Sequence, residues 1–320
     1  MKTLPNTDLT VSTICLGTSD LGTVVPEADA FALLDAFMDH GGNFLDTAAV
    51  YANWIPGEPN VSEKTLGRWM KARGNRSQIV AATKGGHPRL STMHISRLSP
   101  QEIVSDIDDS LHNLQVETID LYYLHRDDPT RPVSEIVEIL NDQVRAGKIR
   151  YLGCSNWRAP RIRAANAYAA EHGLAGFVAD QMLWNLAVVD FAAVADKTVA
   201  MMDADLRQLH TETELAAVPY SSQAGGLFHK MARSALDRMN TGIRGMYRSP
   251  ENIERFKRVQ RLAQETGLSI TQIVLGYLTS QPFVTVPIVG CKTLAHLEDS
   301  LSAVDTTLTP EQVQLLKQGE

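Results

Sequence analysis

The amino-acid sequence predicts a closed (β/α)8 barrel, an α/β fold in which eight parallel strands alternate with outer helices. Short apolar, β-branched runs recur eight times in 320 residues, with loops and segments of helical periodicity between them. The runs are nearly continuous rather than alternating, which is typical of strands buried on both faces. Strand–helix alternation implies parallel pairing through right-handed crossovers, and eight such units favour a closed barrel over an open sheet.

Each expected strand is a short apolar run that ends near a polar residue. The eight runs are residues 11–18, 43–48, 79–84, 119–125, 149–156, 177–185, 214–222 and 285–290. The intervening helices are expected at residues 26–42, 99–114, 132–148, 158–172, 198–210, 251–266, 269–280 and 293–304. The helix at 99–114 has the clearest start, because Ser99 and Glu102 form a capping-box pattern around Pro100.

The domain organisation follows from the same pattern. A Rossmann fold is the alternative, but it requires a G-x-G-x-x-G turn after the first strand, and GTSDLGT (17–23) lacks that fingerprint. We therefore expect one barrel domain over residues 1–320, with residues 1–10 as a hairpin that closes its bottom. Two long loops, 85–99 and 225–252, are expected to act as lids or binding loops.

Composition excludes several classes of function. The formal net charge of −7 and the pI of about 5.7 leave no basic excess for a nucleic-acid partner. The three cysteines are far apart and lack metal-site spacing, so we expect no disulfide, no metal and a reducing cytoplasm. The first residues, MKTLPNTDLT, contain no apolar run, so we expect no signal peptide, and no run approaches the roughly 20 apolar residues that span a bilayer. A membrane partner is therefore not expected.

Polar residues end six consecutive predicted strands. In a barrel of this kind the loops at the C-terminal ends of the strands build the active site, so these residues are expected on one rim. Each alone has an ordinary explanation, such as a turn cap, a solvated lysine or a buried core histidine. Those explanations do not account for the placement of all these residues at one rim of the barrel. The residues are Asp46, Lys84, His125, Ser155, Asn156, Gln181, Tyr220 and Ser221.

Four residues suggest proton transfer to a carbonyl. The phenol of Tyr51 has an ordinary pKa near 10, so it holds a proton at neutral pH and can act as a general acid. Lys84 can stabilise the phenolate that forms, and Asp46 can keep Lys84 ionised. His125 can hydrogen-bond the oxygen that Tyr51 protonates. The set contains no nucleophile or metal cage, so the reducing equivalents have to come from elsewhere, and a nicotinamide would supply them.

The chain resembles the aldo-keto reductase superfamily along almost its whole length. The resemblance is strongest in five motifs that occur in the family's order. They are GGNFLDTAAVY (41–51), SEKTLG (62–67), IVAATKGG (79–86), IDLYYLHR (119–126) and RAGKIRYLGCSN (145–156), with a looser match at PIVGCKTLAHLEDS (287–300). The resemblance implies a barrel that binds NADPH in extended form and interconverts carbonyls and alcohols. It places the catalytic tetrad on Asp46, Tyr51, Lys84 and His125.

The resemblance also implies where the cofactor lies. Positions that hold the nicotinamide carboxamide match Ser155, Asn156 and Gln181, and the aromatic that stacks on the ring matches Tyr220. The family often reads Tyr-Ser-Pro-Leu after this strand, whereas this chain reads Tyr-Ser-Ser-Gln at 220–223. The implied pyrophosphate contacts are Ser221, Gln223 and Gly225.

The adenosine end departs further from the family pattern. Many NADPH-dependent members carry an arginine four residues before an asparagine, and here those positions are His296 and Ser300. Lys292, helped by the backbone around Thr293, is the cation expected to reach a 2′-phosphate. NADP is the expected cofactor and NAD is the alternative.

The substrate and the quaternary state stay open. Trp54 and Trp184 are the candidate substrate contacts, for a small-molecule aldehyde, ketone or sugar. The rival functions are an NAD-dependent alcohol or sugar dehydrogenase, and a cofactor-binding regulatory subunit with little turnover. A monomer and an oligomer are equally compatible with the sequence.

Overall fold

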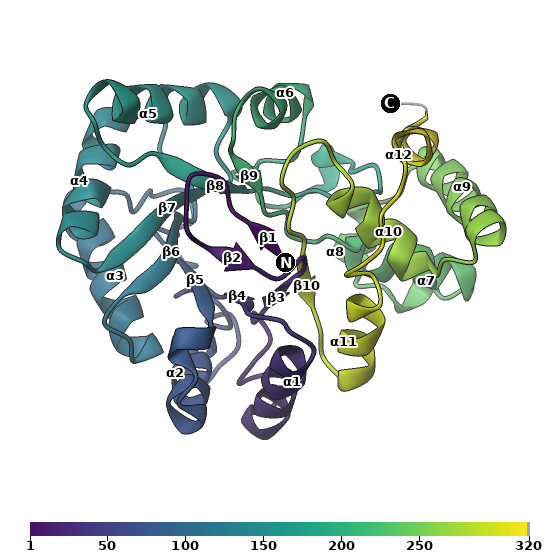
Figure 1. Ribbon diagram of the computed structural model, residues 1–320, viewed down its shortest axis with the longest axis horizontal. Coiled ribbons are helices and arrows are strands. Elements are labelled where there is room, and N and C mark those ends of the chain that lie inside the picture. Colours follow the sequence, from purple (N-terminus) through teal and green to yellow (C-terminus); the bar gives the residue numbers. More distant parts are fainter. Residues whose placement is uncertain (319–320) are drawn as a thin grey trace.

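A ring of parallel strands surrounded by helices makes up the computed structural model, which describes residues 1–318 (Figure 1). The strands pair in the order β10-β3-β4-β5-β6-β7-β8-β9. They are β3 (Cys15–Gly17), β4 (Phe44–Asp46), β5 (Val80–Gly85), β6 (Ile119–Leu124), β7 (Ile149–Ser155), β8 (Phe177–Gln181), β9 (Ala216–Ala217) and β10 (Ile288–Gly290).

Backbone contacts next to β10 close the ring. Ala217 of β9 forms a parallel bridge with Thr285, and its N–H donates to the Val284 carbonyl oxygen at 2.8 Å. The Val286 N–H donates back to the Ala217 carbonyl oxygen at 2.9 Å. The predicted (β/α)8 architecture is confirmed.

The outer helices cover the ring in chain order. The major ones are α1 (Glu27–Asp39), α2 (Val61–Arg73), α3 (Pro100–Leu114), α4 (Val133–Arg145), α5 (Ala159–Glu171), α6 (Ala204–Glu212), α9 (Pro250–Thr266), α10 (Ile270–Thr279), α11 (Leu294–Leu301) and α12 (Pro310–Lys317). Two short helices, α7 (Leu227–Ala232) and α8 (Thr241–Met246), lie inside the long loop expected at 225–252. The capping box of α3 is present as predicted.

Some boundaries differ from the prediction for local reasons. Helix α2 was not predicted. Helix α6 begins at Ala204 rather than 198, because the Asp203 side chain caps it by accepting the Leu206 N–H at 2.8 Å. Strand β9 has only two residues, and Pro219, two residues beyond its end, has no N–H to extend the ladder.

An antiparallel hairpin, β1 (Lys2–Thr3) and β2 (Thr10–Val11), precedes the barrel. Leu4, Leu9 and Val11 are buried in the same cluster as interior strand residues such as Phe44. Asp8 pairs with Arg150 at the start of β7, which places the hairpin at the N-terminal ends of the strands. The open end for chemistry is therefore the C-terminal end.

The barrel interior has one tight fit that depends on a glycine. The ring of Tyr123 on β6 is fully buried inside the barrel and lies against Gly153 on β7. A Cβ atom at Gly153 would lie 2.4 Å from the Tyr123 ring, well inside van der Waals contact. Glycine at 153 is therefore what allows a tyrosine at this level of the interior.

Replacing Gly153 by alanine is expected to lower the free energy of unfolding by about 1–3 kcal/mol, because the methyl group overlaps the Tyr123 ring. Urea denaturation measures the loss. Gly245→Ala is the control, since a Cβ there meets nothing within 4 Å. The loss is expected to shrink when Tyr123 is also replaced by leucine, and an equal loss in both backgrounds would contradict the steric explanation.

Candidate active site

A buried ion pair lies at the C-terminal ends of β4 and β5. Lys84 Nζ donates to Asp46 Oδ2 at 2.7 Å and to the Thr47 carbonyl oxygen at 2.7 Å. The side chains of Lys84 and Asp46 are only 2% and 1% exposed. Gln181 Nε2 on β8 donates to Asp46 Oδ1 at 2.6 Å. Because three strands separate β8 from β4 in the sheet, this hydrogen bond crosses the barrel interior.

The electrostatics keep Lys84 cationic. Burial alone lowers the pKa of a lysine, since it disfavours the charged form. The Asp46 carboxylate and the Tyr51 hydroxyl more than offset that effect, so the pKa of Lys84 lies above its ordinary value. The site therefore holds a fixed positive charge in a dry environment, where its field is strong.

Tyr51 lies directly over this charge. Its ring centroid is 4.6 Å from Lys84 Nζ, and the ring meets His125 edge-on with centroids 5.9 Å apart. Burial raises the pKa of the Tyr51 phenol, Lys84 lowers it and Asp46 raises it, and the net pKa is above the ordinary 10. The phenol therefore carries its proton at neutral pH. The loop that presents Tyr51 is tied to β5, since the Ala49 N–H donates to the Lys84 carbonyl oxygen at 3.2 Å.

His125, just beyond the end of β6, is a neutral imidazole. Burial is the main cause that holds its pKa well below 6.5, and the positive charges of Arg126 and Lys84 act in the same direction. Its Nδ1 atom is buried and has no hydrogen-bond partner among residues 1–318. The ring of His87, from the loop after β5, meets it edge-on with centroids 4.8 Å apart. A neutral ring can offer a hydrogen bond without adding charge.

Sequence reasoning missed the role of Arg126. Its Nη1 donates to the His125 carbonyl oxygen at 2.7 Å, while Nη2 binds Asp196 Oδ2 and Nε binds Thr198 Oγ1, both at 2.8 Å. Arg126 thus fixes the His125 backbone to the loop between β8 and α6. The available signal was an arginine directly after the strand-end histidine in IDLYYLHR.

Residues expected to hold a nicotinamide gather beside the tetrad. Asn156 has a left-handed backbone (φ 63°), and its Nδ2 donates to the His125 carbonyl oxygen at 3.2 Å and to Ser155 Oγ at 3.0 Å. The Tyr220 hydroxyl donates to Asn156 Oδ1 at 2.7 Å. Both polar atoms of the Asn156 amide therefore have hydrogen-bond partners within the protein. Gln181 Oε1, by contrast, is buried and unpaired among the described residues, as an acceptor for a carboxamide N–H would be.

The residues expected to hold the phosphates and adenosine lie on the loops after β9 and β10. Gln223 Nε2 donates to Ser300 Oγ at 2.9 Å, which joins the β9 loop to α11. Thr293 caps α11 by accepting the His296 N–H. The remaining members of this group are Ser221, Gly225 and Lys292.

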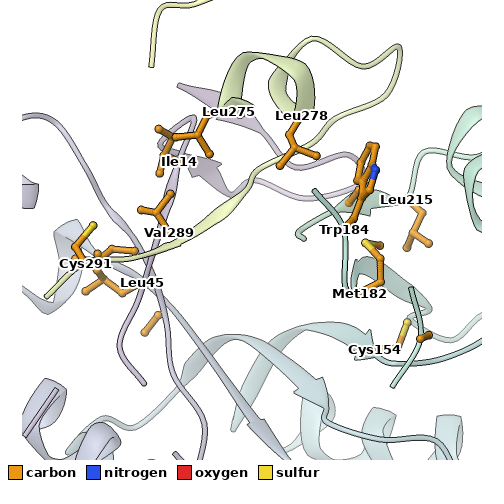
Figure 2. Close-up of a cluster of buried hydrophobic side chains, with 14 of the residues drawn as sticks. Ile14, Leu45, Cys154, Met182, Trp184, Leu215, Leu275, Leu278, Val289 and Cys291 are labelled. Carbon is orange, nitrogen blue, oxygen red and sulfur yellow. The ribbon is translucent and has the colours of Figure 1, made fainter. Parts of the chain in front are cut away.

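The two tryptophan candidates lie in different environments. Trp54 is 52% exposed and meets the Tyr51 ring edge-on, with centroids 6.3 Å apart. Trp184 is buried in the cluster of hydrophobic side chains drawn in Figure 2. Its ring packs against the rings of Tyr277 of α10 and Phe283. The structure therefore brings Trp54 to the tetrad and gives Trp184 a packing position, so substrate contact by Trp184 gains no support.

A hollow in the described part of the chain lies apart from the tetrad. A groove of about 620 Å³ lies between α2 and α3, lined by Arg68, Leu111 and Val116 among others, and it contains none of the tetrad. Within residues 1–318 no group of three or more His, Cys, Asp and Glu side chains could hold a metal ion. None of the helices in that range combines the length and apolar character needed to cross a membrane.

A model of the Aldo/keto reductase family matches residues 13–319. The chain belongs to this family. The resemblance expected from the sequence motifs is confirmed, and the family's general activity is oxidoreduction between carbonyls and alcohols. Its members generally use nicotinamide cofactors.

Three curated relatives illustrate the range. The chain is 30% identical to norsolorinic acid reductase B of Dothistroma septosporum, over 97% of this chain and 78% of the relative. It is 32% identical to aryl-alcohol dehydrogenase [NADP(+)] of Phanerodontia chrysosporium, over 98% of this chain and 83% of the relative. It is 31% identical to the uncharacterized oxidoreductase YrpG of Bacillus subtilis, over 98% of this chain and 93% of the relative.

His125 is expected to stay neutral across roughly pH 6–8, because its lowered pKa means that the ring charges only as the pH falls far below 6.5. Nitrogen chemical shifts in a pH titration by NMR measure this, with the His125 signals assigned by their absence in His125→Gln. Exposed histidines serve as the internal reference. A midpoint near 6.5 for the His125 ring would contradict the prediction.

Proposed function

We propose that this protein is an NADP-dependent aldo-keto reductase that interconverts an aldehyde or ketone and the corresponding alcohol. The observation that carries the proposal is the Tyr51 ring held 4.6 Å above a buried, Asp46-paired Lys84. An isolated buried lysine is costly, and a pair of this kind at the open end of a barrel is a functional-site arrangement.

Each residue of the tetrad has a distinct part in the proposed reaction. Tyr51 gives its proton to the carbonyl oxygen during reduction and takes one from the alcohol during oxidation. Lys84 stabilises the phenolate, and Asp46 holds Lys84 in place and charged. His125, neutral and edge-on to Tyr51, orients the carbonyl oxygen. When bound, a nicotinamide supplies or accepts the hydride.

The cofactor assignment rests on two groups of residues. Gln181 Oε1 is an unpaired buried acceptor beside the tetrad, and Ser155, Asn156 and Tyr220 surround the same region. These fit the carboxamide end of a nicotinamide. Lys292, after β10, is the cation proposed for a 2′-phosphate, and the name of the Phanerodontia relative includes NADP(+). Loops after the last strands of such barrels commonly hold phosphate groups.

An aromatic carbonyl is the proposed substrate class. One of the three relatives, that of Phanerodontia chrysosporium, is named an aryl-alcohol dehydrogenase. In this chain the exposed Trp54 ring lies next to Tyr51, where it can stack against a planar ring that presents its carbonyl to the phenol. A panel of aryl and alkyl aldehydes, ketones and sugars, run in both directions with NADPH and NADH, tests the assignment. Tight NADPH binding with negligible turnover across the panel would instead favour a regulatory subunit.

Tyr51→Phe is expected to lower kcat for carbonyl reduction by about 100-fold or more, because the variant keeps the ring and loses the proton donor. NADPH binding, measured by quenching of tryptophan fluorescence, should be retained. Tyr151→Phe is the matched control, since the Tyr151 hydroxyl binds Asp8 at the opposite end of the barrel. Wild-type turnover in Tyr51→Phe would show that another group is the acid.

Lys292→Ala is expected to weaken NADPH binding by roughly tenfold and NADH binding by less than twofold, because only NADPH carries the 2′-phosphate. Calorimetric titration of both cofactors measures this. Lys148→Ala is the control, since Lys148 precedes β7 at the opposite end of the barrel. An equal loss of affinity for NADPH and NADH would show that Lys292 contacts a part of the dinucleotide that both cofactors share.

A further inference from the structure

An ion pair joins the loops that follow the first and last strands of the barrel. Lys292 Nζ lies 3.2 Å from Asp20 Oδ2, with Lys292 53% and Asp20 29% exposed. Asp20 belongs to the loop between β3 and α1, and Lys292 to the loop between β10 and α11. Strands β3 and β10 are hydrogen-bonded neighbours, with Gly17 opposite Gly290, so the two loops leave the barrel side by side.

Asp20 lies on a loop with fixed geometry. Its carbonyl oxygen accepts the Val25 N–H at 2.9 Å and the Thr23 hydroxyl at 3.2 Å. The next residue, Leu21, is 2% exposed and its N–H donates to the Thr18 carbonyl oxygen. Lys292, in contrast, is a long and mostly exposed side chain. A ligand can therefore draw Lys292 away, while the Asp20 carboxylate stays nearby.

Few basic residues lie near Lys292 in the sequence. Residues 288–302 contain Lys292 and His296 as their basic residues, against Glu298 and Asp299. A phosphate that binds Lys292 has to compete with Asp20 for the ammonium group, and it meets the Asp20 carboxylate at short range. A ribose hydroxyl meets no such repulsion, and carboxylates are the groups that accept hydrogen bonds from the 2′-hydroxyl of NAD.

We infer that Asp20 is a cofactor-selectivity residue. It reduces the preference that Lys292 gives to a 2′-phosphorylated dinucleotide, so that the protein accepts NADPH and NADH with affinities closer together than Lys292 alone would set. The inference rests on the proposed function, since it assigns Lys292 to the adenosine end of the cofactor.

The test compares Asp20→Asn with the wild-type protein by calorimetric titration of NADPH, NADH, 2′,5′-ADP and 5′-AMP. Asp20→Asn is expected to bind NADPH and 2′,5′-ADP roughly three- to tenfold more tightly, because the repulsion is removed and Lys292 is released. NADH and 5′-AMP affinities are expected to change by less than twofold. The gain for NADPH is expected to fall as salt concentration rises.

Two control variants separate charge from shape. Asp20→Glu keeps the carboxylate and is expected to match the wild type. Asp108→Asn removes the carboxylate from a comparable ion pair with Lys148. Lys148 directly precedes β7, at the end of the barrel opposite the proposed cofactor site, so this variant is expected to leave the affinity for every cofactor unchanged.

The outcomes distinguish this inference from the proposed function. If NADPH binds and Asp20→Asn leaves its affinity unchanged, or raises the NADH affinity equally, the role of Asp20 is wrong and the proposed function stands. If neither dinucleotide binds the wild-type protein, the proposed function is wrong and the inference falls with it.

Discussion

The buried Lys84–Asp46 pair is the interaction on which the rest of the site depends. An ammonium group that is 2% exposed is stable only with a close counter-charge and filled hydrogen bonds. The Asp46 carboxylate is the counter-charge of Lys84, and the Thr47 carbonyl oxygen accepts a second hydrogen bond from the ammonium group. Gln181 donates a hydrogen bond to the other carboxylate oxygen of Asp46. The pair therefore ties β4, β5 and β8 together across the barrel. Removing either partner would leave an uncompensated charge, a loss that typically costs 3–5 kcal/mol.

The barrel can hold this pair because its interior is layered. Every second residue of a barrel strand points into the interior. On these strands one inward residue is apolar, and the next inward residue, nearer the C-terminal end of the strand, is polar. Phe44 lies two residues before Asp46, Ala82 two before Lys84, and Tyr123 two before His125. The N-terminal hairpin closes the apolar end with Leu4 and Leu9, among other buried residues. Chemistry is thus confined to the end where the polar layer meets the loops.

This alternation explains which features the sequence could predict. Asp46, Lys84 and His125 were identifiable because each follows an apolar run by a fixed step, and the structure brings them together around Tyr51. The eight-stranded barrel followed from the repeat itself. Local periodicity alone locates strands and their ends without any knowledge of distant partners.

Features that depend on pairing between distant segments were not predictable in this way. Trp184 was predicted to contact the substrate because it lies at the end of a predicted strand, but Tyr277 and Phe283, more than 90 residues later, pack against it. The ion pair between Arg126 and Asp196 joins residues 70 positions apart. Asp20 and Lys292 come from opposite ends of the chain and meet only because the barrel closes between its first and last strands. Each depends on a contact between segments far apart in the chain, which no local pattern encodes.

The two ends of the proposed cofactor region differ in how their positive charge is held. At the tetrad, Lys84 is buried, paired and immobile, so its field acts on one atom, the Tyr51 oxygen, with little screening. At the distal loop, Lys292 is exposed and partly neutralised by Asp20, so its effect is weak and sensitive to salt. Proton transfer depends on position to within a fraction of an ångström, whereas recognition of a distant phosphate tolerates movement. The buried pair beside Tyr51 therefore suits a reaction that requires fixed geometry, whereas the exposed pair at Lys292 suits binding of either proposed dinucleotide.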